Sequence, residues 1–188
     1  MGKRIKYTAV SAVIILAGLL LYRFYVIPKV LYPIKYSDFV DRYSEEYELE
    51  KNIIYAVIKA ESGFDASDRS HTGARGLMQI MPETGEWAAE LIGLNGYDSE
   101  QLYDPETNIH IGCWYLRYLL DMYDNNLSTA LAAYNAGLGN VSKWLDDPEY
   151  SADGANLDIV PYKETDGYVK KTLEYMEKYE KYYEELKN

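Results

Sequence analysis

The sequence contains few of the residues that form disulfides and metal centres. Its 188 residues include one cysteine, Cys113, which excludes an intrachain disulfide and a zinc site built from several cysteines. Its two histidines, His71 and His110, are too few for a histidine-rich centre. His110 and Cys113 are three residues apart and could form a ligand pair, but no further ligands accompany them. We therefore expect no bound metal.

Positive charge is scarce after the first 36 residues. Residues 1–36 hold six basic residues and no acidic one, whereas the rest of the chain holds 13 basic and 30 acidic residues, a net charge of -17. A domain of this charge repels phosphate backbones, so nucleic acid is not an expected partner. Hydrophobic residues make up 48% of the chain, which is enough for a core and excludes wholesale disorder.

The longest uncharged run lies near the N-terminus and predicts a membrane anchor. Residues 7–22 carry no charge, and the apolar residues 24–27 lengthen the run enough for a helix to cross a hydrocarbon core of roughly 30 Å. Basic residues within 1–6 favour a cytoplasmic N-terminus and an extracytoplasmic domain. A cleaved signal peptide is the alternative, although bulky residues follow the run. We expect a single-pass protein held in the lipid bilayer by residues 7–27, with a linker over 28–36.

From residue 37 onward the patterns are helical, which predicts a mainly α domain over residues 37–188. Apolar residues recur at helical spacing, prolines occupy first-turn positions and glycines occupy stop positions. Ser37 and Ser128 are predicted N-caps, and residues 146–159 are a predicted polar loop. The predicted helices cover about residues 37–47, 50–62, 82–92, 105–123, 128–137, 141–145 and 163–186.

Glu61 is the candidate catalytic acid on the second of these helices. Ile54, Val57 and Ile58 form the inward face of that helix, and Glu61 projects from the same face beside the break at Gly63. Desolvation at such a position raises the pKa of a carboxyl group, and a carboxyl that is protonated near neutral pH suits a general acid. The helix alone favours the other interpretation, a partly exposed residue at a helix end that only flanks the core.

The segment after Glu61 combines small and polar residues. Gly73 and Gly76 permit close approach of the backbone to a ligand, and Ser70 and Gln79 can bond to hydroxyl or acetamido groups. Met81 adds adaptable apolar surface. A loop that leads into a buried helical turn explains the same composition.

Four separated stretches together resemble the lytic transglycosylases of the soluble (SLT) type. They are ESGFDASDRSHTGARGLMQIMP at 61–82, YDPETNIHIGCWYLRYLL at 103–120, ALAAYNAGLGNV at 130–141 and VPYKETDGYVKKTLEY at 160–175. They occur in the order found in that family. The resemblance implies a lysozyme-like helical fold, related to goose-type lysozymes, for the domain behind the predicted transmembrane helix.

The resemblance also implies a set of site residues. Glu61 matches the single catalytic acid of the family, and the other matched positions line or close the sugar groove. The matched groove residues are Ser70, Gln79, Met81, Tyr134, Asn135, Glu164 and Tyr168.

The implied substrate is the glycan of peptidoglycan, cut between N-acetylmuramic acid and N-acetylglucosamine. One glutamate would act first as acid and then as base, leave a 1,6-anhydro end and need no metal or cofactor. A hydrolytic muramidase and a non-catalytic wall-binding module are the alternatives. Protein partners are not predicted by the sequence.

Three polar residues beside Glu61 are open to a second interpretation. Asp65 and Asp68 could supply the second carboxylate of a hydrolase, but we favour loop-solvating roles for both. His71 lies among small residues, where we expect a surface or loop-tying group.

Overall fold

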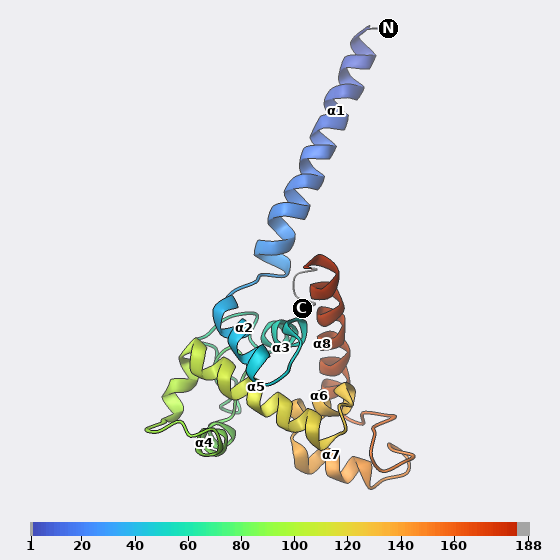
Figure 1. Ribbon diagram of the computed structural model, residues 1–188. Helices are drawn as coiled ribbons and strands as arrows, with labels where there is room; N and C mark the ends of the chain where they lie inside the picture. The colour runs from blue at the N-terminus through green and yellow to red at the C-terminus, as the bar shows by residue number, and fades with distance from the viewer. Residues whose placement is uncertain (1, 184–188) are drawn as a thin grey trace. The chain divides into compact units, whose positions relative to one another are not determined.

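The computed structural model describes residues 2–183, which divide into two compact units, residues 2–35 and residues 36–183 (Figure 1). In the first unit, α1 (Gly2–Leu21) continues into the π-helix η1 (Tyr22–Leu31). Helix therefore extends into the segment that was predicted as a linker. Pro28 lies inside the π-helical part, where the wider turn accommodates a residue that cannot donate a backbone hydrogen bond.

The first unit contains one candidate membrane span, Val10–Leu31. By length and composition this stretch is suited to cross a bilayer, and most of its large apolar side chains are exposed. Apolar side chains that are not buried within the protein would be buried among lipid chains if this helix crossed a bilayer.

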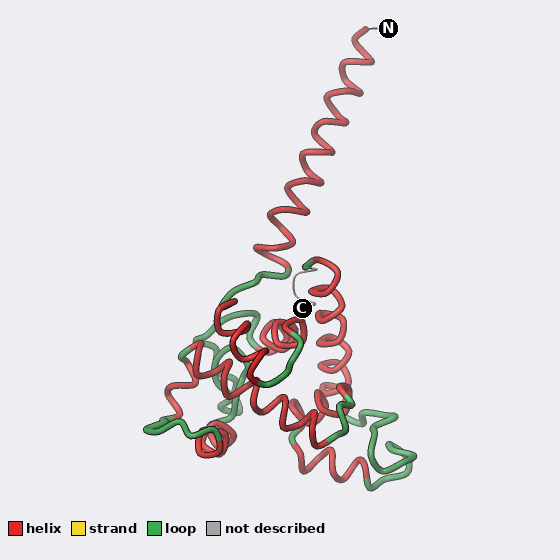
Figure 2. Tube along the Cα trace, viewed as in Figure 1, coloured by secondary structure: helices red, strands yellow, loops and turns green. Residues whose placement is uncertain are grey.

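The second unit is a helical domain. Its elements are α2 (Ser37–Glu46), α3 (Lys51–Glu61), α4 (Pro82–Leu91), the 3₁₀ helix η2 (Ser99–Tyr103), α5 (Pro105–Met122), α6 (Leu127–Ala136), α7 (Leu138–Leu145) and α8 (Lys163–Tyr182). Within residues 2–183 the chain forms helices, turns and loops but no strands (Figure 2). The predicted mainly α class is confirmed.

Helix α3 lies at the centre of this domain. Every residue from Asn52 to Ile58 is buried, so the predicted inward face is confirmed, and the opposite face is covered as well. Helix α8 packs along α3, where the rings of Tyr55 and Tyr179 stack with centroids 5.4 Å apart. This packing places the end of α3 against the first turns of α8.

The helix ends differ from the sequence prediction in three places. Ser37 is not a cap, since α2 is preceded by Tyr36 and has no side-chain cap. Ser128 is not a cap either, because the side chain of Asn126 accepts the hydrogen bond from the Thr129 N–H and starts α6 one residue earlier. Helix α7 begins at Leu138, directly after Gly137.

Other helix ends match the prediction. The Asp104 carboxylate accepts a hydrogen bond from the Thr107 N–H, and Pro105 opens α5 as expected. Residues 184–186, where the last helix was predicted to continue, lie outside the described part of the chain.

Candidate active site

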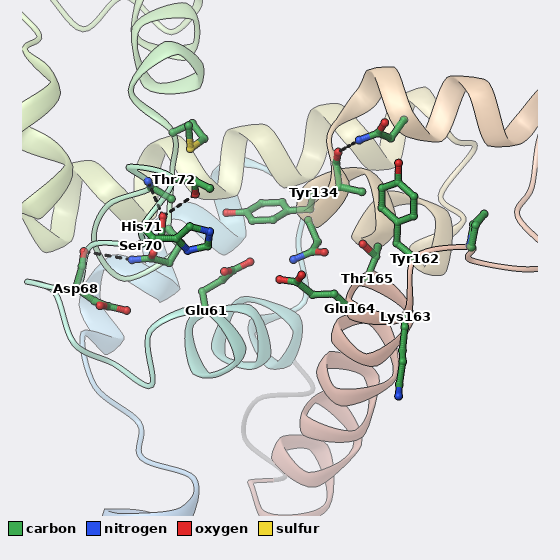
Figure 3. Close-up of a pocket in the computed structure, with 17 residues that line it drawn as sticks. Glu61, Asp68, Ser70, His71, Thr72, Tyr134, Tyr162, Lys163, Glu164 and Thr165 are labelled. Carbon is green, nitrogen blue, oxygen red and sulfur yellow. Dashed lines mark hydrogen bonds between the residues drawn. The ribbon is translucent and has the colours of Figure 1, made fainter.

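Glu61 is the last residue of α3, and its partly buried side chain lines a groove with a volume of about 870 Å³ (Figure 3). The chain turns sharply after it, since Gly63 and Phe64 both adopt positive φ angles. Phe64 is buried and its ring lies against Tyr55, which fixes the turn to the core. The carboxyl is thus held by a rigid helix end and faces an open hollow.

Burial raises the pKa of Glu61 to about 7, and this is the largest influence on the group. Tyr168 and the positive charge of Lys171 act in the opposite direction and lower the same pKa. The Tyr168 hydroxyl is buried and interacts electrostatically with the Glu61 carboxyl. At neutral pH the carboxyl can therefore exist in both protonation states.

The loop that follows α3 is tied to the rest of the domain through Asn108, a buried residue of α5. Its side-chain oxygen accepts a hydrogen bond from the Met78 N–H at 2.7 Å, and its amide group donates to the carbonyls of Arg75 and Leu102. Gly76 lies so close to Leu102 that an added Cβ would stand 2.1 Å from the Leu102 oxygen. Sequence reasoning missed Asn108, although it lies within the second motif stretch.

Ser70 and Gln79 belong to this loop and line the groove. The Ser70 hydroxyl accepts a hydrogen bond from the Ala74 N–H at 2.9 Å, so it also shapes the loop. Gln79 has a positive φ, and its amide nitrogen donates to the carbonyls of Asp68 and Gly76. Since both N–H bonds are engaged, the carbonyl oxygen of Gln79 is the part of this amide left to receive a ligand's hydroxyl.

Tyr134 and Asn135, in the last turn of α6, form part of the groove wall together with Met81. The Tyr134 hydroxyl donates a hydrogen bond to the Met78 carbonyl at 2.9 Å, which joins α6 to the loop. The Tyr134 ring packs on Tyr115 with centroids 5.3 Å apart. A smaller hollow of about 240 Å³ adjoins this wall and shares Gln79, Met81, Tyr134 and Asn135 with the main groove.

Helix α8 supplies Glu164 and Tyr168 in its first two turns. Glu164 is exposed and lines the groove, with its carboxyl directed towards Glu61 in Figure 3. Tyr168 is not part of the groove lining; it is buried and acts on the Glu61 carboxyl. The structure thus places seven of the eight sequence-predicted site residues in the groove lining, and the eighth, Tyr168, interacts with Glu61.

The groove also includes residues that sequence reasoning did not select. Asp68 and His71 line it, whereas Asp65 is exposed and accepts hydrogen bonds from the Ser67 N–H and hydroxyl, a loop role. Asp68 and His71 lie within the motif stretch 61–82, and that position was the signal available in the sequence. The remaining lining residues are Thr72, Ala74, Ala136, Asn140, Pro161, Tyr162, Lys163 and Thr165.

His110 and Cys113 pack against other side chains of the domain and do not line the groove. The His110 Nε2 pairs with the Tyr47 hydroxyl at 2.8 Å, and its ring stacks on Tyr43. Cys113 is fully buried, and its thiol has a raised pKa because of that burial. Among the described residues, no group of three or more His, Cys, Asp or Glu side chains could hold a metal ion.

Residues 38–156 match the family model described as the Transglycosylase SLT domain. The soluble lytic murein transglycosylase of Escherichia coli K12 is 40% identical over 146 residues, which are 77% of this chain and 23% of that protein. The membrane-bound lytic murein transglycosylase C of Actinobacillus pleuropneumoniae serotype 5b is 31% identical over 129 residues, 63% of this chain and 35% of that protein. The chain spans about a quarter of the length of the first of these relatives and about a third of the second.

Solved structures give the same result. The crystal structure of the 70 kDa soluble lytic transglycosylase from Escherichia coli is similar with a TM-score of 0.71 and 36% identity, over 80% of this chain and 25% of that one. The complex of the 70 kDa soluble lytic transglycosylase with bulgecin A gives a TM-score of 0.71 and 37% identity over the same shares. The resemblance and the lysozyme-like helical fold predicted from the sequence are confirmed.

Proposed function

Because the chain belongs to the transglycosylase SLT family, we propose that it is a membrane-anchored lytic transglycosylase of the bacterial cell wall. The proposed substrate is the glycan of peptidoglycan, cut between N-acetylmuramic acid and N-acetylglucosamine. The observation that supports this most directly is Glu61, whose carboxyl faces the groove and has a pKa of about 7. Such a group can donate and then accept a proton near neutral pH.

The proposed reaction needs one carboxyl group. Protonated Glu61 donates its proton to the glycosidic oxygen, the bond from that oxygen to C1 of the muramic acid breaks, and the N-acetylglucosamine leaves with a free hydroxyl. The acetamido oxygen of the muramic acid stabilises the positive charge at C1. The C6 hydroxyl of the same sugar then bonds to C1 and returns its proton to Glu61, so no water is consumed. The attack is intramolecular, which removes the entropic cost of bringing in a second reactant.

Neighbouring groups assist Glu61 in this scheme. Tyr168 and Lys171 lower the pKa of Glu61 against the effect of burial, which leaves it at about 7, near the working pH. The Gln79 oxygen, Ser70 and Asn135 provide polar contacts for sugar substituents, and Met81 provides an apolar one.

Hydrolysis is the second candidate, and Asp68 is the observation that favours it. A muramidase that inverts the anomeric carbon needs a second carboxylate to activate water across the groove from the acid. Asp68 lines the groove, and Figure 3 shows it on the opposite side of Glu61 from Glu164. The fate of the cleaved end separates the two reactions, because hydrolysis leaves a reducing muramic acid that is heavier by one water.

Mass spectrometry of digested cell-wall glycan tests the proposal with the purified full-length chain in detergent. We expect anhydro ends from the wild type, and a loss of about 10²- to 10⁴-fold in cleavage from Glu61→Gln with wall binding retained. Asp68→Asn is the matched control and should leave the product unchanged. Reducing ends that disappear in Asp68→Asn would establish hydrolysis instead. Wall binding without any cleavage by the wild type would establish a binding module.

The proposal places residues 7–27 in the lipid bilayer, with the N-terminus in the cytoplasm and the catalytic domain outside. The candidate span Val10–Leu31 and the membrane-bound relatives support the anchor, and the basic residues of 1–6 support the orientation. Protease added to intact cells stripped of their wall should digest the domain of residues 37–188. Protection of the domain until the membrane is opened would reverse the orientation.

A further inference from the structure

Tyr162 is a large aromatic side chain that stays exposed inside the groove. The residue is 52% exposed, it lines the groove, and it lies directly before α8. Burial of an aromatic ring is favourable, so a ligand that covers the exposed part of this ring gains binding free energy. Pro161, which precedes it and also lines the groove, restricts the backbone there.

The ring of Tyr162 is held in place by Trp144 of α7. The two ring centroids are 4.8 Å apart at an interplanar angle of 78°, an edge-to-face contact. Trp144 is itself only 6% exposed, so it is a fixed support. A ring that is already ordered loses little conformational entropy when a ligand packs on it.

Tyr162 lies to one side of the acid, where it can contact only one part of a bound glycan strand. In Figure 3 Tyr162 and Asp68 lie on opposite sides of Glu61, and the Lys163 side chain points away from the acid. Asn140 lines the same groove, and its amide nitrogen donates to the Ala136 carbonyl, which leaves its oxygen for a ligand. An aromatic ring and an amide oxygen in one groove match a pyranose ring, which has apolar C–H faces and hydroxyl edges.

We propose that Tyr162, supported by Trp144, is a stacking platform for a sugar ring beyond the two that flank the cleaved bond. This inference rests on the proposed function, since it takes the groove to hold a glycan strand. It makes Tyr162 a specificity residue that favours longer strands. The acid chemistry at Glu61 does not depend on it.

Equilibrium binding tests the platform without any need for cleavage. The probe is the hexasaccharide of N-acetylglucosamine, titrated into full-length Glu61→Gln protein in detergent. Adding Tyr162→Ala or Tyr162→Leu should weaken hexasaccharide binding about tenfold, while Tyr162→Phe should retain it because the ring face is kept. The leucine variant maintains apolar contact with Trp144, so it separates loss of the platform from loss of folding. Ile159→Ala is the matched control, because Ile159 is equally exposed at 52% in the same loop and does not line the groove.

Kinetics on wall glycan give the second measurement. In the chain with native Glu61, Tyr162→Leu should raise KM on long strands and leave kcat unchanged. Two results would contradict the proposal. One is equal hexasaccharide affinity in Tyr162→Phe and Tyr162→Leu, and the other is a fall in kcat without a change in KM. If the wild type yields no anhydro ends while the binding difference persists, the proposed reaction fails and the platform stands.

Discussion

Replacing Glu61 by glutamine should make the protein more stable, by an amount that grows from zero near pH 4.5 to its full size above pH 7. The pKa of Glu61 in the folded chain is about 7, above its ordinary value of 4.5. Between these values the folded state holds a proton that the unfolded state has released. The free energy of unfolding of the wild type therefore falls as the pH rises from 4.5 to 7, and the loss is complete above pH 7. Glutamine has the same shape and does not ionise.

The size of the effect follows from the same two pKa values. Their difference corresponds to about 3 kcal/mol, at roughly 1.4 kcal/mol for each pH unit. Water in the open groove screens part of the penalty, so we expect about 1 to 3 kcal/mol above pH 7 and close to zero at pH 4. For a domain of this size the midpoint of thermal unfolding should rise by roughly 2 to 10 °C.

Thermal unfolding of the full-length chain in detergent, followed by circular dichroism at pH 4 and pH 8, measures this difference. Glu164→Gln is the control, because Glu164 is an exposed carboxyl of the same groove and its replacement should shift neither midpoint. If Glu61→Gln and the wild type unfold together at pH 8, the carboxyl is not desolvated. A stabilisation of equal size at both pH values would mean that ionisation is not its cause. Either result would refute the reasoning.

Two further predictions concern the same groove. The rate constant kcat/KM for wall glycan should fall about tenfold per pH unit above pH 7, because Glu61 must be protonated to act as acid; initial rates from pH 5 to 9 check this, and a flat profile would contradict it. Asn108→Ala should lower the free energy of unfolding by about 2 to 5 kcal/mol, since it leaves the buried Met78 N–H and Leu102 carbonyl unpaired. Denaturant unfolding measures that loss, and a change below about 0.5 kcal/mol would show that the loop has other support.

The helical architecture could be predicted because its signals are local. Pro82, Asp104 with Pro105, and Gly137 mark helix ends through the chemistry of one or two residues, and the structure places ends at each of them. Ser128 misled the prediction because Asn126 is an equally good cap two residues earlier, and only the choice of hydrogen bond distinguishes them.

The lining of the groove was only partly predictable. The motif residues Ser70, Gln79 and Tyr134 were found because they lie in recognisable stretches. Tyr162 lies within such a stretch as well, but its exposure and its contact with Trp144 depend on how α7 packs against the segment before α8. No local pattern reports whether an aromatic ring faces the core or a groove.

The sequence alone determined the helical class, the apolar N-terminal segment and the family, and it singled out Glu61 as the candidate acid, because periodicity and motif spacing are properties of neighbouring residues. The tertiary structure decided the pKa of that acid. Its value depends first on the burial of Glu61 at the end of α3, and then on Tyr168 and Lys171. These two residues lie more than a hundred residues further along the chain and approach Glu61 only because α8 packs along α3. Burial and long-range electrostatics are properties of the packed domain. The protonation of Glu61 near neutral pH, which the proposed reaction requires, therefore depends on the tertiary structure.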